Sequence, residues 1–146
     1  MAISQAIANS FKKELLEGEH NFKQSGGDKF KLSLYTAGAT LTSATTSYTT
    51  SNEVAPSGQY TAGGGALVNN GTSIASGVAI VDFADRSFTG VTLTARGALI
   101  YNTSATVTDA AVCALDFGAD KTATSGTFTI QFPAFTTAAA ILRISG

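Results

Sequence analysis

The stretch Thr127-Phe-Thr-Ile-Gln-Phe132 decides the fold class, because its apolar and polar residues alternate with a period of two. Phe128, Ile130 and Phe132 share one face, while threonine and glutamine side chains share the other. This alternation is typical of a β-strand with one face in the core and one in solvent. We therefore expect a half-buried strand at 127–132.

A weak internal echo extends this pattern along the chain. Val78-Ala-Ile-Val-Asp-Phe-Ala-Asp85 is similar to Val112-Cys-Ala-Leu-Asp-Phe-Gly-Ala-Asp120. Each is predicted to be a buried strand that runs into an acidic turn. A second strand follows in each unit, at 91–102 in the first and at 127–132 in the second.

Two further strands are expected, at 30–35 and at 140–144, with Arg143 on the face opposite to Leu142 and Ile144. Many strands with turn signals between them, and a single helical segment, predict a mainly β fold. The expected architecture is an antiparallel β-sandwich or barrel with one N-terminal helix.

The N-terminal segment has a different period. Four apolar residues recur at every fourth position, which predicts one helical stripe: Ile3, Ile7, Phe11 and Leu15. The predicted helix runs from Ile3 to Glu17, with Ser4 as the candidate N-cap and Gly18 as the C-terminal cap. The stripe is expected to be an assembly or core seam.

Two interpretations of this helix stay open. It packs on its own domain, or it docks on a partner after swinging outward at Gly18 and at the Gly26-Gly27 pair. A length of 146 residues indicates a single domain over 1–146. Within it, 1–27 would be the N-terminal helix and hinge, and 28–146 the β-domain.

Composition excludes several classes of protein. A net charge of −1 with 13% charged residues gives no basic excess for neutralising nucleic-acid phosphates. One cysteine excludes an intramolecular disulfide framework and a cysteine-based zinc cluster. Neither an apolar run of about 20 residues nor a secretory signal is present, so no membrane partner is expected and synthesis in the cytoplasm is the default.

Four aspartates are the only acidic cluster to consider as a metal site: Asp82, Asp85, Asp116 and Asp120. If the two echoed turns lay side by side, their carboxylates could approach a Ca²⁺ ion. The calcium-loop spacing is missing, so we expect turn residues and no metal. His20 is expected to be solvated or a cap, and Cys113 a small core residue. No catalytic residue and no cofactor are predicted.

Alanine, threonine, glycine and serine make up about half of the chain. A long region of this composition, residues 36–65, has Tyr48, Val54 and Tyr60 as scattered anchors. Its length favours a role at a surface or an interface. The scarcity of charge also favours assembly into a homo-oligomer, because small and hydroxylated residues are covered at modest desolvation cost.

Several phrases resemble a widespread group of tailed-bacteriophage virion proteins, in order and spacing, from about residue 9 to the C-terminus. They are NSFKKELLEG at 9–18, HNF at 20–22, FKLSLYT at 30–36, YTTSNEV at 48–54, SGQY at 57–60 and TARGALIYN at 94–102. This resemblance implies a non-enzymatic structural component of the virion, made in the host cytoplasm. It carries no catalytic residues.

Within that class we expect a capsid decoration, or cement, protein that stabilises the shell, with the phage major capsid protein as partner and a trimer as the favoured oligomer. The alternatives are a tail, baseplate or fibre component, or a receptor- or carbohydrate-binding module. A carbohydrate module would need an exposed aromatic cluster, for which the chain offers Tyr48, Tyr60 and Tyr101.

Overall fold

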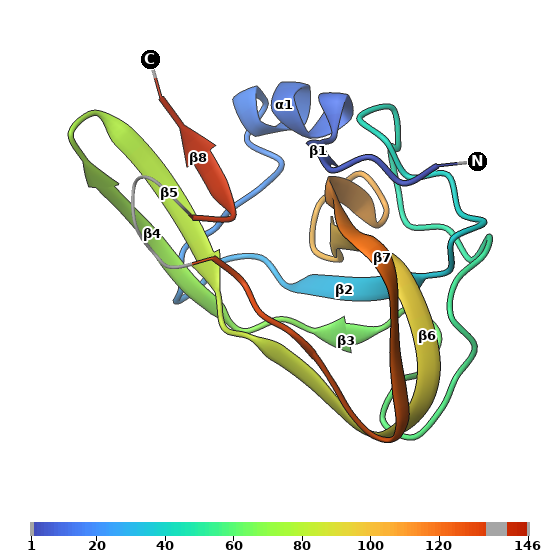
Figure 1. The fold of residues 1–146 in the computed structure, drawn as a ribbon. Coiled ribbons are helices and arrows are strands. Elements are labelled where there is room, and N and C mark those ends of the chain that lie inside the picture. Colours follow the sequence, from blue (N-terminus) through green and yellow to red (C-terminus); the bar gives the residue numbers. More distant parts are fainter. Residues whose placement is uncertain (1, 134–139, 146) are drawn as a thin grey trace.

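The computed structural model describes residues 2–133 and 140–145. These residues form one helix and eight strands, arranged in two antiparallel sheets with the orders β1-β7-β6-β2-β3 and β4-β5-β8 (Figure 1). The predicted mainly β class with an N-terminal helix is confirmed. The elements in chain order are β1 (Ala6–Ile7), α1 (Asn9–Leu16), β2 (Phe30–Tyr35), β3 (Gly65–Ala66), β4 (Asn69–Ala75), β5 (Val78–Phe83), β6 (Arg86–Asn102), β7 (Ala110–Ile130) and β8 (Leu142–Ile144).

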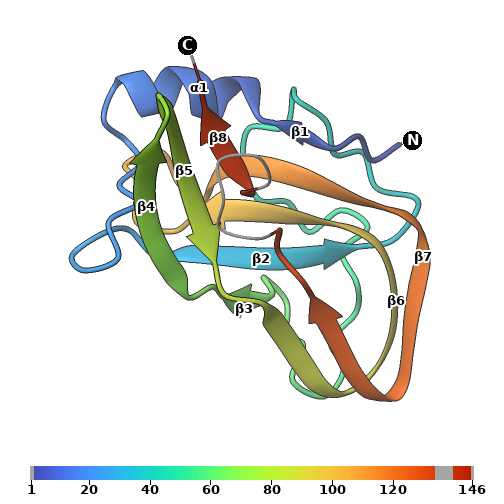
Figure 2. The same ribbon diagram turned by 60° about the vertical axis from the view of Figure 1, so that its left-hand side comes forward.

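The core lies between the two sheets. Leu32 of β2 and Leu99 of β6 are fully buried and belong to the same apolar cluster as Leu142 of β8. Phe30 and Phe83 join the sheets directly, with ring centroids 5.6 Å apart. Helix α1 lies across one end of the molecule, beside β8 (Figures 1 and 2).

The paired strands β6 and β7 are longer than the sequence pattern predicted. They pair from Arg86↔Ile130 to Asn102↔Ala110 and bend sharply at the end of the molecule away from α1 (Figure 2). The predicted acidic turn at 116–120 is wrong, because these residues remain within β7. The register shifts there, between Ala95↔Lys121 and Gly97↔Asp116. The two strands pair on both sides of this shift, so the extra residues of β7 form a bulge.

The helix is shorter than predicted. It begins after the N-cap Ala8, which makes no side-chain capping bond, so Ser4 is not the cap. Ile7 lies in β1 opposite Cys113, and Ile3 bridges to Leu41. Isoleucines suit an extended backbone, and pairing with distant strands overrides the helical spacing. The C-terminal cap is confirmed, since Gly18 has a φ of 76°.

The N-terminal segment packs on its own domain in this structure. Ala8 and Phe11 are buried, and the Ala8 amide donates a 2.9 Å hydrogen bond to the carbonyl of Val112. Phe22, close to the expected hinge, stacks on Phe30 with 4.6 Å between ring centroids. These contacts favour the interpretation of a packed helix over that of an arm swung outward.

The region 36–65 is tied down by buried tyrosines. The Glu53 carboxylate accepts hydrogen bonds from the hydroxyls of Tyr48 (2.5 Å) and Tyr60 (2.7 Å) and from the amide of Gly63 (2.8 Å). The Tyr101 hydroxyl donates to the carbonyl of Gly63. Tyr60 and Tyr101 are buried, and Tyr48 stacks on Tyr101. The three tyrosines expected for a sugar platform therefore do not form an exposed aromatic cluster.

This tyrosine network predicts unfolding in alkali. Burial raises the pKa of Tyr35 to about 12, and burial also raises the pKa of Tyr48, Tyr60 and Tyr101. Unfolded tyrosines ionise near pH 10, so the stabilisation is complete below about pH 10 and is lost as the pH rises through the folded values. Ionisation of Tyr35 alone should lower the unfolding free energy by about 2 kcal/mol by pH 12.

Urea denaturation at several pH values, together with tyrosinate absorbance, tests this prediction. The pKa is raised for all four tyrosines of the chain, so ionisation and unfolding should appear as a single cooperative transition. Ionisation of the native protein near pH 10 without unfolding would contradict the prediction.

Among the described residues, no helix is long and apolar enough to cross a membrane.

Candidate docking surface

A cavity of about 490 Å³ opens between α1, the loop that follows it and the three-stranded sheet. Phe11 and Leu15 of α1 form one wall, and Val81 of β5 and Leu142 of β8 belong to the other. Two cationic residues, Lys23 and Arg143, also line it, and among the residues that the structure describes no acidic one does. A cavity of this size and apolar character is typical of a binding site.

The register of the three-stranded sheet explains its apolar wall. Ala79 of β5 is opposite both Ile74 of β4 and Ile144 of β8. Residues directly opposite one another in an antiparallel sheet project from the same face. Val81 and Leu142, one pair further along, project from this face as well and are buried against the core.

Three large exposed apolar side chains either line this cavity, as Ile144 does, or neighbour residues that line it, as Ile74 and Leu16 do. Ile74 is 72% exposed and Ile144 58% exposed, at the end of the sheet beside α1 (Figures 1 and 2). Leu16, between the cavity-lining residues Leu15 and Gly18, is 91% exposed. We refer to the cavity together with Leu16, Ile74 and Ile144 as the apolar groove. Grouped apolar side chains of this kind mark interaction sites on folded proteins.

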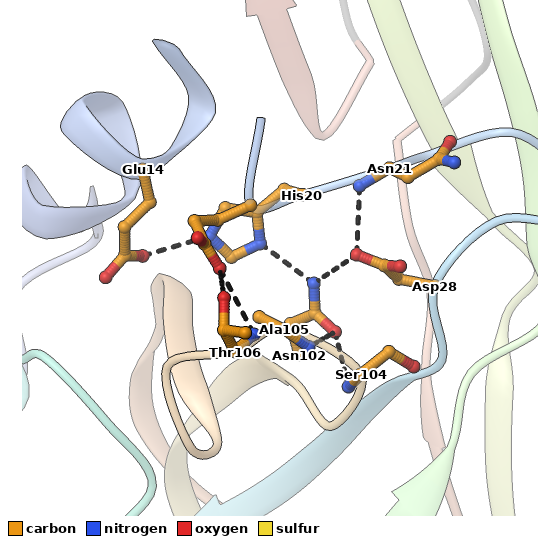
Figure 3. A network of polar contacts seen from close by, with 9 residues as sticks. Glu14, His20, Asn21, Asp28, Asn102, Ser104, Ala105 and Thr106 are labelled. Atoms are coloured by element: carbon orange, nitrogen blue, oxygen red, sulfur yellow. Dashed lines mark hydrogen bonds and ion pairs between the residues drawn. The ribbon is translucent and has the colours of Figure 1, made fainter. Parts of the chain in front are cut away.

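A buried polar network forms the back of the apolar groove (Figure 3). His20, which lines the cavity, contacts the Glu14 carboxylate through Nε2 and the Asn102 amide through Nδ1, both at 2.9 Å. The Asn102 amide also donates to Asp28 at 2.7 Å. Glu19 accepts hydrogen bonds from the amide and the hydroxyl of Thr106. The network fastens α1 and the following loop to the start of the β6–β7 connection.

The predicted seam residues are only partly brought together. Ile7, Phe11 and Leu15 line the cavity. Ile3 does not line it. Its side chain packs beside Gly97 of β6, where an added Cβ would lie only 2.9 Å from it. Phe11 is buried, whereas the other three residues are partly buried against the core. The four residues are therefore not one helical face, since only Phe11 and Leu15 lie in α1.

The four aspartates do not come together as one cluster. Asp82 lies within β5 and accepts a hydrogen bond from Asn70, and Asp85 accepts one from the amide of Phe132. Asp116 and Asp120 lie in β7, beside Arg96 at 3.9 and 3.7 Å. The turn prediction is wrong for the three that lie in strands. β5 and β7 belong to different sheets, so the echoed segments do not pair with each other.

Two further residues were candidates for chemistry. Cys113 is buried in the core as predicted, and burial raises the pKa of its thiol to about 12. The prediction of a solvated or capping His20 is wrong, because its side chain is fully enclosed. Its charged sequence neighbours suggested solvent, but the ring stacks against Phe11 and Phe22. Glu14, six positions earlier in the chain, and Asn102, 82 positions later, satisfy its nitrogens.

Sequence reasoning missed the sheet wall of the apolar groove and the polar network behind it. Ile74 and Ile144 meet only through their common partner Ala79, and a pairing register across distant strands has no local signal. Asn102 is 82 positions from His20.

No protein-family model, no curated protein and no solved structure matches this chain.

Proposed function

We propose that this chain is a non-enzymatic structural component of a tailed-phage virion, and that it acts as a capsid decoration, or cement, protein on the shell. The observation that carries the docking part of the proposal is the apolar groove, with Leu16, Ile74 and Ile144 exposed around it. The assignment to a virion rests on the resemblance of the phrases between residues 9 and 102 to phage virion proteins.

The physical properties of the surface support an assembly role. Each exposed isoleucine or leucine contributes roughly 1.5–3 kcal/mol when a partner buries it fully. A shell offers many equivalent positions, so modest interfaces of about 1,200–2,000 Å² suffice when they are repeated. A closed trimer of this protein would match local three-fold positions on an icosahedral shell. The partner is then the major capsid protein, and the location is the virion.

Attachment to purified heads that lack this protein tests the proposal. The wild-type chain should co-sediment with the heads in hundreds of copies. Ile74→Glu should weaken attachment at least about tenfold, because a carboxylate cannot be buried in an apolar contact. Val68→Glu is the matched control, since Val68 is 64% exposed but precedes β4, at the opposite end of this strand from Ile74. It should attach like the wild type.

The location and copy number separate the alternatives. A few copies found only at the tail would contradict the cement role and favour a tail, baseplate or fibre component. Absence from both heads and tails would contradict the virion assignment. Equal attachment of the Ile74→Glu variant would contradict the apolar groove as the docking surface. Light scattering of the isolated chain measures the oligomer, for which a trimer is the expected result.

A further inference from the structure

The single histidine of the chain has both ring nitrogens engaged. Nε2 of His20 lies 2.9 Å from Oε1 of Glu14, and Nδ1 lies 2.9 Å from Nδ2 of Asn102 (Figure 3). The side chain of His20 has no exposed surface. The proton positions on this ring therefore follow from the donors and acceptors that face it.

The orientation of the Asn102 amide is determined by its other partners. Its Oδ1 accepts hydrogen bonds from the backbone amides of Ser104 (2.8 Å) and Ala105 (3.2 Å). Its Nδ2 donates to Oδ2 of Asp28 at 2.7 Å. An amide nitrogen only donates, so Nδ1 of His20 must accept. His20 is then neutral, with its proton on Nε2 and directed at Glu14.

We propose that neutral His20 is an acid-sensitive latch that holds α1 in place beside the apolar groove, and that a second proton on His20 releases it. A proton on Nδ1 would set an N–H group against the amide hydrogens of Asn102. Asn102 cannot turn over without losing its bonds to Asp28, Ser104 and Ala105. The hydrogen bond is therefore lost and the imidazole ring has to move.

Movement of this ring is coupled to α1 by packing. The ring centroid of His20 lies 4.7 Å from that of Phe11 in α1 and 6.4 Å from that of Phe22. Since the ring is enclosed, it cannot shift without displacing these neighbours. Phe11 and Phe22 both line the cavity. Release of the latch would therefore change the wall of the apolar groove.

When His20 gains a proton, the hydrogen bond of Nδ1 is lost and that of Nε2 is kept, because of the charged groups around the ring. Glu14 in α1 and Asp28 in the following loop are carboxylates of the network (Figure 3). Glu19, at the start of that loop, is a third. The Nε2–H donates to Glu14 in both protonation states, so that contact persists. Lys23 of the loop and Arg143 of β8 line the same cavity and oppose a further positive charge there. At the end of β6 and the start of the β6–β7 connection, the groups bonded to this network are neutral: those of Asn102, Ser104, Ala105 and Thr106.

Nitrogen NMR of the ring tests the first step on the unaltered protein. The chain has one histidine, so the ring signals need no assignment. At about pH 8 we expect the neutral tautomer with the proton on Nε2. A proton on Nδ1 at this pH, or a charged ring, would overturn the proposal whatever any variant does.

Hydrogen exchange of the α1 amides tests the second step, after correction for the pH dependence of intrinsic exchange. Protection should fall about tenfold or more between about pH 8 and pH 5, as expected for one lost buried hydrogen bond. His20→Gln is the matched variant, because its amide can donate to Glu14 and accept from Asn102 without titrating. Its α1 protection should stay constant over this range.

Two results would contradict the latch. One is unchanged α1 protection in the wild type at about pH 5. The other is an equal loss of protection in His20→Gln, which would place the titration on a carboxylate instead. The latch concerns the conformation of α1 in the isolated chain, so it goes beyond the proposed function and does not depend on it. Failure of head attachment leaves this test intact.

Discussion

Replacing Gly64 with alanine should lower the free energy of unfolding by roughly 4 kcal/mol or more, a large share of the stability of a domain this size. Gly64 has a φ of 81°, a backbone conformation that residues with a Cβ rarely adopt. An added Cβ would also overlap the carbonyl group of Leu32. That carbonyl is backbone of β2, so relief of the overlap must pull β3 away from its pairing partner.

Gly77→Ala is the matched control for this prediction. Gly77 has a φ of 76°, but an added Cβ there would meet nothing within 4 Å. It isolates the cost of the left-handed conformation, which is about 1–2 kcal/mol. Chemical denaturation of both variants measures the difference. Equal losses would show that the contact between Gly64 and β2 is looser than the structure has it.

The strands of this fold were predictable where each strand separates the core from solvent. Phe30, Leu32 and Leu34 alternate with more polar residues, and this alternation has a direct physical cause in burial. The start of the helix was not predictable in the same way. Ile3 and Ile7 satisfy a helical spacing, but they pair with Leu41 and Cys113, which are far away in the chain. Long-range pairing leaves no local trace.

The candidate site was likewise predictable only where its residues are close in sequence. Ile7, Phe11 and Leu15 could be predicted as a seam, because they are close in sequence and share an apolar character. The opposite wall depends on the register that aligns Ile74 and Ile144 with Ala79. His20 was placed in solvent because its sequence neighbours are charged. Only the fold shows that aromatic rings enclose it.

Replacing Phe11 with aspartate should cost roughly 4 kcal/mol of unfolding free energy. Phe11 is 4% exposed, and its ring contacts those of His20 and Phe22. Removal of a buried phenylalanine costs about 3–5 kcal/mol, and the new carboxylate adds a desolvation cost. It would also lie near the buried Glu14 of the same helix, so a second negative charge would enter the same enclosed site. The midpoint of urea denaturation measures the loss.

Lys12→Asp is the control, because Lys12 is the neighbouring residue of α1 and is exposed. It introduces the same carboxylate into the same helix without touching the core, and surface changes of this kind shift stability by about 0.5 kcal/mol. A stable Phe11→Asp variant would mean that α1 does not pack as described, and both the apolar groove and the latch would lose their inner wall. An unstable Phe11→Asp variant together with a stable Lys12→Asp variant would show that α1 is a structural part of the core. Only the exposed rim of the helix would then be available to a partner.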